Sequence, residues 1–273
     1  MRMPRHPCSF VPLLLLALLA ACQRESSPAA ADPQTTVAPV QAPDVVSLQD
    51  VVETTPDYIV GISFPQSAAK QPALAQALKT YAATARGDLM KAVAGLEGHK
   101  PTAPYDLSLQ FTGLVDTPDI LAVAADGSSY TGGAHGIPLV ARFVWLPKTQ
   151  KMLTAQALFT SANAWQVISD AAREQLSTTL SQRLDADDVE GAERAQQLQN
   201  GSRMIDDGTA PKAENFAQFE PVMDVSGRIR ALRFVFPPYQ VGPYVDGTRS
   251  VDIPARVLLP IMAPDYKTLF MGG

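Results

Sequence analysis

The sequence contains few cysteines and few histidines. Both cysteines, Cys8 and Cys22, lie near the N-terminus of the 273-residue chain, so the rest of it has no thiol for a disulfide, a metal or a nucleophile. The three histidines are His6, His99 and His135, and none is paired in the His-x-x-x-His spacing of a zinc site. We therefore expect no metal and no cofactor, and stability must come from packing.

Positive charge is also scarce. The chain has 22 Lys and Arg against 27 Asp and Glu. Residues 1–21 hold two arginines and no acid, so the remainder has 20 basic and 27 acidic side chains and a formal net charge of −7. Nucleic-acid binding needs clustered Lys and Arg, so this balance argues against it and suits a basic partner. Apolar residues make up 46%, enough for a sizeable core.

Residues 1–21 have the pattern of a lipoprotein signal peptide. The apolar run from Phe10 to Ala21 is shorter than the roughly 20 residues of a membrane-spanning helix and suits a signal-peptide core. It ends in Leu-Ala-Ala before Cys22, which resembles the lipobox of bacterial lipoproteins, where diacylglycerol is attached to the cysteine sulfur. Because Gln23 rather than aspartate follows, the resemblance implies an outer-membrane destination. The alternative is a soluble secreted protein whose cysteine falls there by chance.

Residues 22–44 have a composition typical of a linker. They are rich in Ala, Pro, Ser, Thr and Gln and contain no aromatic residue. Such a segment buries too little apolar surface to offset the entropy lost on ordering. We expect a disordered tether between the lipid and the body of the protein.

The remaining residues predict an α+β body, an antiparallel sheet with packed helices, in two sub-parts: a helix–sheet part at 45–160 and an α+β part at 161–273. Strands are expected where apolar residues alternate with polar ones or cluster, and helices where they recur every three or four positions. The expected strands lie in 51–64 (one or two), 105–112, 120–125, 137–145 and 228–236. The expected helices cover 72–96, 165–184 and a short segment from Pro254, with 185–211 as an acidic surface loop or irregular helix.

Two stretches carry a family resemblance. Residues 130–136 read Tyr-Thr-Gly-Gly-Ala-His-Gly, and residues 238–244 read Pro-Tyr-Gln-Val-Gly-Pro-Tyr. Their order and spacing, over roughly residues 50–270, resemble the extracytoplasmic domain found in RsiV, a lysozyme-sensing anti-sigma factor, and in the accessory module of the peptidoglycan deacetylase PdaC. The resemblance implies a non-catalytic envelope protein that binds a lysozyme-like protein or a peptidoglycan fragment.

These two stretches also supply the candidate binding residues. Glycines permit a left-handed backbone or a close approach to a ligand, and tyrosines on rigid loops suit binding surfaces. Both stretches also have a purely structural interpretation. The first would be a tight strand connection held by a hydrogen bond of His135, and the second a loop that caps the sheet edge. The candidates are Tyr130, Gly132, Gly133, His135, Pro238, Tyr239, Gly242 and Tyr244.

An enzyme is the alternative interpretation. A cell-wall hydrolase using His135 would need an activated serine and a carboxylate, and Ser128 and Ser129 are close in sequence. No Gly-x-Ser-x-Gly elbow is present, and nothing points to a carboxylate pair, so no catalytic residue is assigned. The acidic run 185–190 resembles a calcium loop poorly because its turn glycine is misplaced.

Overall fold

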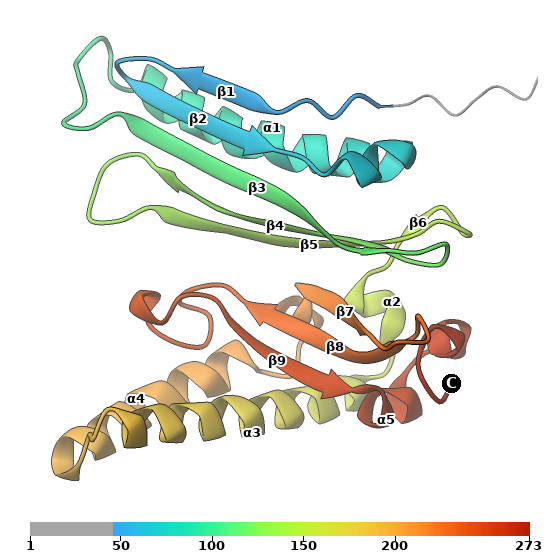
Figure 1. Ribbon diagram of the computed structural model, residues 1–273. Helices are drawn as coiled ribbons and strands as arrows, with labels where there is room; N and C mark the ends of the chain where they lie inside the picture. The colour runs from blue at the N-terminus through green and yellow to red at the C-terminus, as the bar shows by residue number, and fades with distance from the viewer. Residues whose placement is uncertain (1–45) are drawn as a thin grey trace, which may run out of the picture. The chain divides into compact units, whose positions relative to one another are not determined.

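The structure, a computed structural model, describes residues 46–273. The predicted signal peptide (1–21), the lipid site Cys22 and the tether (22–44) therefore lie outside the described residues. The described part contains two β-sheets, called sheet A and sheet B below, with helices packed against each (Figure 1). The α+β class expected from the sequence is confirmed.

Sheet A has six strands in the order of the chain. Strands β2 and β3 run parallel, and every other neighbouring pair is antiparallel. A parallel pair needs a long crossover, and helix α1 (Pro72–Ala94) supplies it. The sheet is therefore mixed rather than wholly antiparallel. Its strands are β1 (Val51–Thr54), β2 (Tyr58–Ser63), β3 (Tyr105–Asp116), β4 (Leu121–Tyr130), β5 (Ile137–Leu146) and β6 (Lys151–Met152).

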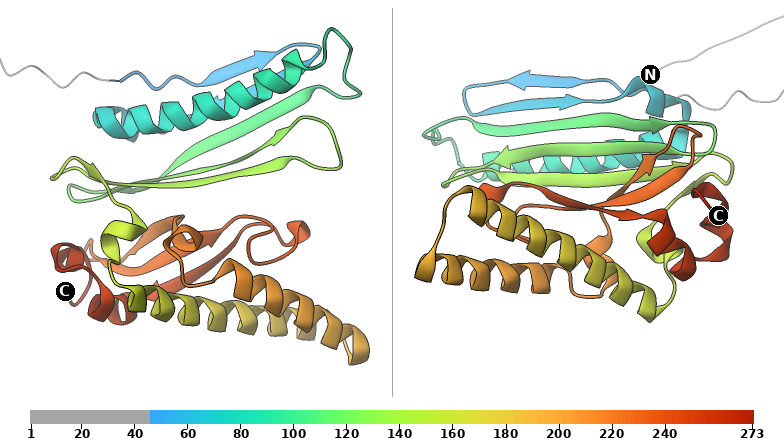
Figure 2. Two further views of the ribbon diagram at one scale, coloured as in Figure 1. Left: turned by 180° about the vertical axis from the view of Figure 1, so that it is seen from behind. Right: turned by 60° about the horizontal axis from the view of Figure 1, so that its bottom comes forward.

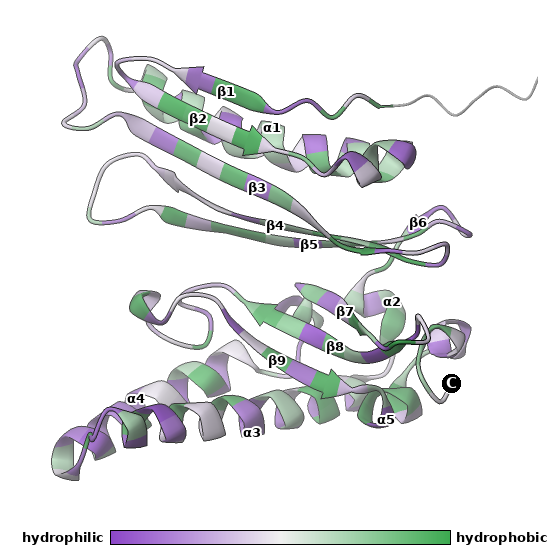
Figure 3. Cartoon of the chain, in the orientation of Figure 1, coloured by the Kyte–Doolittle hydropathy of each residue, from purple (hydrophilic) through white to green (hydrophobic). Residues whose placement is uncertain are grey.

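The two faces of sheet A pack into two different cores. Hydrophobic and hydrophilic residues alternate along β3 (Figure 3). The buried side chains of β3 form one core with Leu74, Leu78 and Leu89 of α1. Because successive side chains of a strand point to opposite faces, β4 contributes Leu121 and Val123 to this core and Ala122 to the other. Sheet A thus has apolar neighbours on both sides.

Sheet B has three antiparallel strands, β7 (Phe219–Met223), β8 (Ile229–Phe236) and β9 (Arg249–Pro254). The helices α3 (Ala162–Ala186) and α4 (Gly191–Gly208) form a hairpin that covers it (Figures 1 and 2). Aromatic side chains fill the core between them, with Phe216, Phe234 and Phe236 fully buried. The short helices are α2 (Ala155–Leu158), α5 (Ala255–Leu258) and the 3-10 turns η1 (Gln66–Lys70), η2 (Ala213–Phe216), η3 (Tyr244–Asp246), η4 (Leu259–Ile261) and η5 (Pro264–Leu269).

A polar link joins the two sheets. Nε of Arg142, on β5, lies 2.8 Å from the Glu220 carboxylate on β7, and Nη1 lies 3.0 Å from Asp126 on β4. The main-chain N–H of Arg142 also donates to the side-chain oxygen of Gln218 at 2.7 Å. The side chains of Arg142 and Glu220 are only 8% and 14% exposed, so this ion pair lies in a region of weak solvent screening.

Two expectations about individual segments were wrong. The strand expected at 120–125 does not end there, because β4 continues through Asp126 and Gly127, and Gly127 pairs with Leu109 and Leu139 on the two neighbouring strands. A Cβ at Gly127 would collide with the main-chain oxygen of Ser108, so this glycine allows close strand approach. The segment 185–211, expected to be an acidic surface loop or an irregular helix, is mostly the regular helix α4.

Candidate functional site

The loop between β4 and β5 carries the first predicted stretch. Gly132 and Gly133 have φ values of +96° and +100°, a left-handed region that residues with a Cβ rarely adopt. The Tyr130 hydroxyl donates to the carbonyl of Gly133 at 3.3 Å, which closes the loop on itself. His135 is exposed beside it.

The second stretch follows β8 and is held by its own turns. The N–H of Gln240 donates to the Pro237 carbonyl at 3.1 Å, and the N–H of Tyr239 donates to the Gly242 carbonyl at 3.1 Å. The Gln240 side chain donates to the carbonyls of Gly208 (3.0 Å) and Asn215 (2.9 Å), which fixes the loop against the end of α4. Tyr239 is left 53% exposed on this anchored base.

The structure brings the two stretches together, although they are about a hundred residues apart in the chain. Nε2 of His135 lies 2.9 Å from the Tyr239 hydroxyl, and the His135 ring stacks on Tyr244 with a centroid distance of 4.0 Å and an interplanar angle of 18°. The two tyrosine rings are 5.6 Å apart. We call these three side chains the His–Tyr surface.

The hydrogen bonds of His135 select one tautomer of its neutral ring. Nδ1 lies 3.1 Å from the carbonyl of Gly136, which only accepts, so the neutral ring carries its proton on Nδ1. Nε2 then accepts from the hydroxyl of Tyr239. Both ring nitrogens are thus engaged by a carbonyl and a phenol, not by the serine and carboxylate of a hydrolase triad.

The other predicted residues have supporting positions. Gly242 is buried, and a Cβ there would lie 3.0 Å from a carboxylate oxygen of Asp246, so this glycine serves packing rather than a left-handed turn. Gly132 lies beside the Tyr105 ring. Pro238 is half-buried at the start of the loop. The sequence analysis missed two exposed apolar neighbours in the chain, Ile137 (61%) and Val245 (87%).

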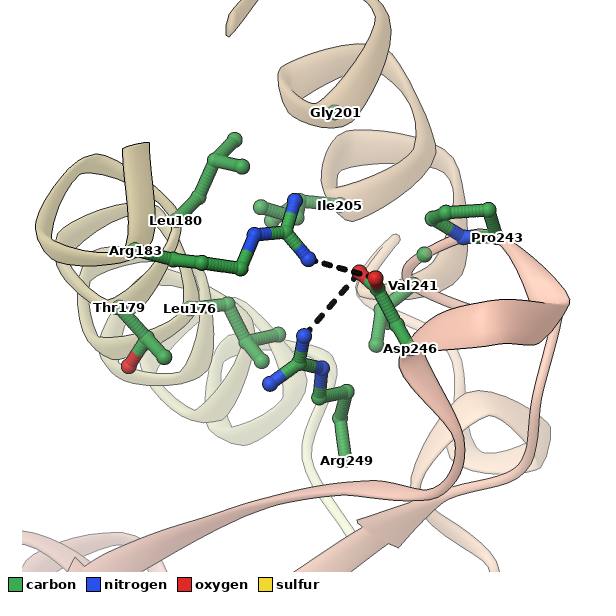
Figure 4. Close-up of a pocket in the computed structure, with 11 residues that line it drawn as sticks. Leu176, Thr179, Leu180, Arg183, Gly201, Ile205, Val241, Pro243, Asp246 and Arg249 are labelled. Atoms are coloured by element: carbon green, nitrogen blue, oxygen red, sulfur yellow. Dashed lines mark ion pairs between the residues drawn. The ribbon is translucent and has the colours of Figure 1, made fainter. Parts of the chain in front are cut away.

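Charged side chains that the sequence analysis did not single out gather behind the second loop. Nη1 of Arg183, on α3, lies 2.5 Å from one Asp246 oxygen, and Nη2 of Arg249, on β9, lies 3.1 Å from the other (Figure 4). Burial by itself would raise the pKa of Asp246, but the hydrogen bonds and charges of the two arginines outweigh it and lower this pKa. Nothing in the local sequence reveals this cluster, because Arg183 is distant in the chain.

Within residues 46–273, no group of three or more His, Cys, Asp or Glu side chains is placed to hold a metal ion. The same part of the chain contains no helix that is long and apolar enough to cross a bilayer.

Comparison with known proteins gives a family for part of the chain. Residues 156–256 match a family model described as "Protein of unknown function (DUF3298)". The matched region contains Tyr239, Tyr244 and the three residues of the arginine–aspartate cluster, and His135 lies outside it. No curated protein shows a significant match to the chain.

Two crystal structures of proteins described as DUF3298 family members are similar to this one. A DUF3298 family protein from Pseudomonas aeruginosa PAO1 is 16% identical, with a TM-score of 0.52, and the match covers 82% of this chain and 96% of that one. A member from Bacteroides fragilis NCTC 9343 is 17% identical, with a TM-score of 0.46, and covers 80% of this chain and 93% of that one. The likeness to the Pseudomonas protein shows a shared fold.

Proposed function

We propose that this protein is a non-catalytic lipoprotein of the cell envelope whose body binds a lysozyme-type protein through the His–Tyr surface. The observation that carries the proposal is the meeting of His135 with Tyr239 and Tyr244 from a loop far away in the chain. Both loops belong to the stretches that resemble the RsiV-type domain, and that resemblance supplies the lysozyme-type partner.

The chemistry of the surface supports a protein partner. Tyrosine is enriched among the residues that dominate binding energy at interfaces, where it offers a large rigid area with a polar tip. Ile137 and Val245 follow His135 and Tyr244 closely in the chain and are strongly exposed, which adds apolar area near the rings. Lysozyme-type enzymes are usually basic, and residues 22–273, with a formal net charge of −7, would attract them over a distance.

The hydrogen bonds of His135 favour binding over hydrolysis. A general base needs a free nitrogen aimed at the nucleophile, with a carboxylate behind the ring. Here Nε2 faces the Tyr239 hydroxyl and Nδ1 faces a main-chain carbonyl. His135→Ala tests this point, because a hydrolase would lose its turnover of cell-wall material in a folded protein, whereas a binding module would have none to lose.

Titration calorimetry of the purified full-length chain against hen-type lysozyme tests the binding. Changing Tyr239 and Tyr244 together to Ala should weaken binding by about thirtyfold or more, since a hot-spot side chain contributes about 2 kcal/mol or more. Neutralising Asp187 and Glu190 at the tip of the helix hairpin is the control, and it should matter far less because exposed charges contribute little. Heat with soluble muropeptides alone would make the ligand peptidoglycan, and heat with neither would overturn the proposal.

The envelope location is tested separately. If Cys22 carries the lipid, Cys22→Ala should abolish the incorporation of labelled palmitate and leave the chain uncleaved or mislocalised. Unchanged labelling of the variant would contradict the proposed anchor and the outer-membrane location together.

A further inference from the structure

A groove with cationic and amide side chains in its lining lies between Arg183 of α3, helix α4 and Pro243. It has a volume of about 520 Å³ and opens from a smaller recess of about 40 Å³, which holds the Asp246 cluster of Figure 4. Groove and recess share Arg183, Gly201 and Pro243 as lining residues. The polar side chains that line the groove are Arg183, Gln197, Asn200 and Arg203.

The charges of this region do not balance. Arg183, Arg203 and Arg249 bring three positive charges to the combined lining, and Asp246 is the one acidic residue among them. The surplus is notable because the chain has more acidic than basic side chains. It also lies partly out of water, since the side chains of Arg183 and Arg249 are 31% and 30% exposed and that of Asp246 is 14% exposed.

The two recessed arginines retain donors for a ligand. A guanidinium has five N–H donors in a fork that matches the oxygens of carboxylates and phosphates. Within the described part of the chain, the ionic contact of Arg183 and that of Arg249 both go to Asp246, each through a single nitrogen. Asp246 thus holds both cations in place with most of their donors unused.

We propose that this groove is a binding site for an oxyanion group, a carboxylate or a phosphate, held by Arg183, Arg203 and Arg249. The recess, of about 40 Å³, is much smaller than the groove, of about 520 Å³, so the anionic group lies where the two meet, at Arg183, with Arg249 on the recess side and Arg203 on the groove side. The rest of the ligand lies in the groove beside Asn200. The inference does not rest on the His–Tyr surface, because none of its three side chains lines the groove or the recess.

Arg203 gives the sharpest test because it is exposed, so its replacement should leave the fold intact. The purified full-length chain is titrated at low chloride with inorganic phosphate, with N-acetylmuramic acid, and with N-acetylglucosamine, which lacks the carboxylate. Arg203→Gln should weaken the binding of the anions by about tenfold, as expected for the loss of a hydrogen bond between charged groups. Arg230→Gln, at an exposed arginine of β8 outside the groove, should leave it unchanged.

A second variant separates a binding site from a purely structural cluster. Asp246→Asn removes the charge with which an incoming anion must compete, so it should strengthen anion binding even though it lowers the melting temperature. Binding of phosphate alone would identify a phosphate-bearing ligand, and binding of the muramic acid alone a carboxylate-bearing one. The proposal is overturned if neither anion binds at millimolar concentration, if the neutral sugar binds equally well, or if Arg203→Gln and Arg230→Gln have the same effect.

Discussion

At the scale of single residues, the backbone of Tyr239 is the most informative feature of the candidate surface. Its φ is +72°, a left-handed conformation that costs a residue with a Cβ about 1–2 kcal/mol and costs glycine almost nothing. The two turns that anchor the loop impose this conformation. A strained tyrosine at an exposed position is difficult to explain by stability, and strain of this kind is common at binding sites.

A matched pair of variants isolates the strain. Tyr239→Ala and Tyr239→Gly both remove the ring, but only glycine relieves the backbone, so the glycine variant should be the more stable of the two by about 1 kcal/mol. Urea denaturation measures this difference, and lysozyme titration should show the same loss of affinity in both. If alanine proved the more stable replacement, the left-handed conformation would not be costly here.

Asp106, on β3, provides a pH-dependent test at the same scale. Desolvation by burial raises its pKa above the ordinary value of 3.8. A raised carboxyl pKa contributes stability that is fully present below the ordinary value and is lost as the pH rises through the folded-state pKa. Asp106→Asn should therefore raise the melting temperature at neutral pH and make no difference below about pH 3, where both forms are uncharged.

The control for Asp106 lies at the end of the same strand. Asp116 is exposed, so Asp116→Asn should leave the melting temperature nearly unchanged over the same range. A stabilisation by Asp106→Asn that persisted in acid would have to come from packing and not from the carboxyl charge.

At the scale of secondary-structure elements, the glycines of α4 explain how closely its neighbours approach. Gly201 and Gly208 are seven residues apart, which places them on nearly the same face of the helix. A Cβ at Gly201 would come within 2.6 Å of a methyl carbon of Leu180 on α3, and one at Gly208 would collide with the main-chain oxygen of Gln240. Glycine at these two positions therefore lets Leu180 and Gln240 approach the backbone of α4 closely.

Replacing these glycines by alanine tests that interpretation. Gly208→Ala should destabilise the protein by about 2 kcal/mol or more, because main chain cannot move aside as a side chain can. Gly201→Ala should cost less, since the end of Leu180 is flexible. In α1, a Cβ at Gly87 would meet no atom within 4 Å, so Gly87→Ala should instead stabilise the protein by up to about 1 kcal/mol. Thermal unfolding compares the three variants.

Strand β3 and the helices α1 and α4 show which elements the sequence could predict. The period-two alternation from Tyr105 and the period of three to four from Leu74 follow from one buried face, and both segments have the predicted type. The glycines of α4 resemble helix breakers, which is why the sequence predicts a loop or an irregular helix there. Their partners, Leu180 and Gln240, are set by tertiary packing that local sequence does not encode.

The candidate site was predictable to a similar degree. Glycine-rich and Pro-Tyr stretches marked both loops, but their mutual contact depends on sheets A and B packing together. The stack of His135 on Tyr244 is therefore a product of the tertiary fold. Arg183 and Asp246 had no local signal, since an arginine on a helix and an aspartate in a loop are ordinary until the fold brings them together.

At the scale of the whole molecule, the Arg142–Glu220 pair joins the two sheets. Glu220→Gln takes from the nearly buried Arg142 the less exposed of its two carboxylate partners, so it should lower the free energy of unfolding by about 2 kcal/mol. Asp252, which pairs with Arg233 and is 38% exposed, is the control, and Asp252→Asn should cost no more than about 1 kcal/mol. Equal losses of unfolding free energy in the two variants, measured by urea denaturation, would mean that the Arg142–Glu220 pair stabilises the protein no more than an exposed ion pair does.

The His–Tyr surface takes His135 from the end of sheet A and its two tyrosines from the loop after β8 in sheet B. A partner that grips all three side chains binds only when the two sheets are docked, so binding and docking are thermodynamically linked. At a concentration one hundred times its dissociation constant, such a partner adds about 2.7 kcal/mol to the docked state. Occupancy of the His–Tyr surface would then require two conditions together: that the partner is present, and that sheets A and B of this protein are docked.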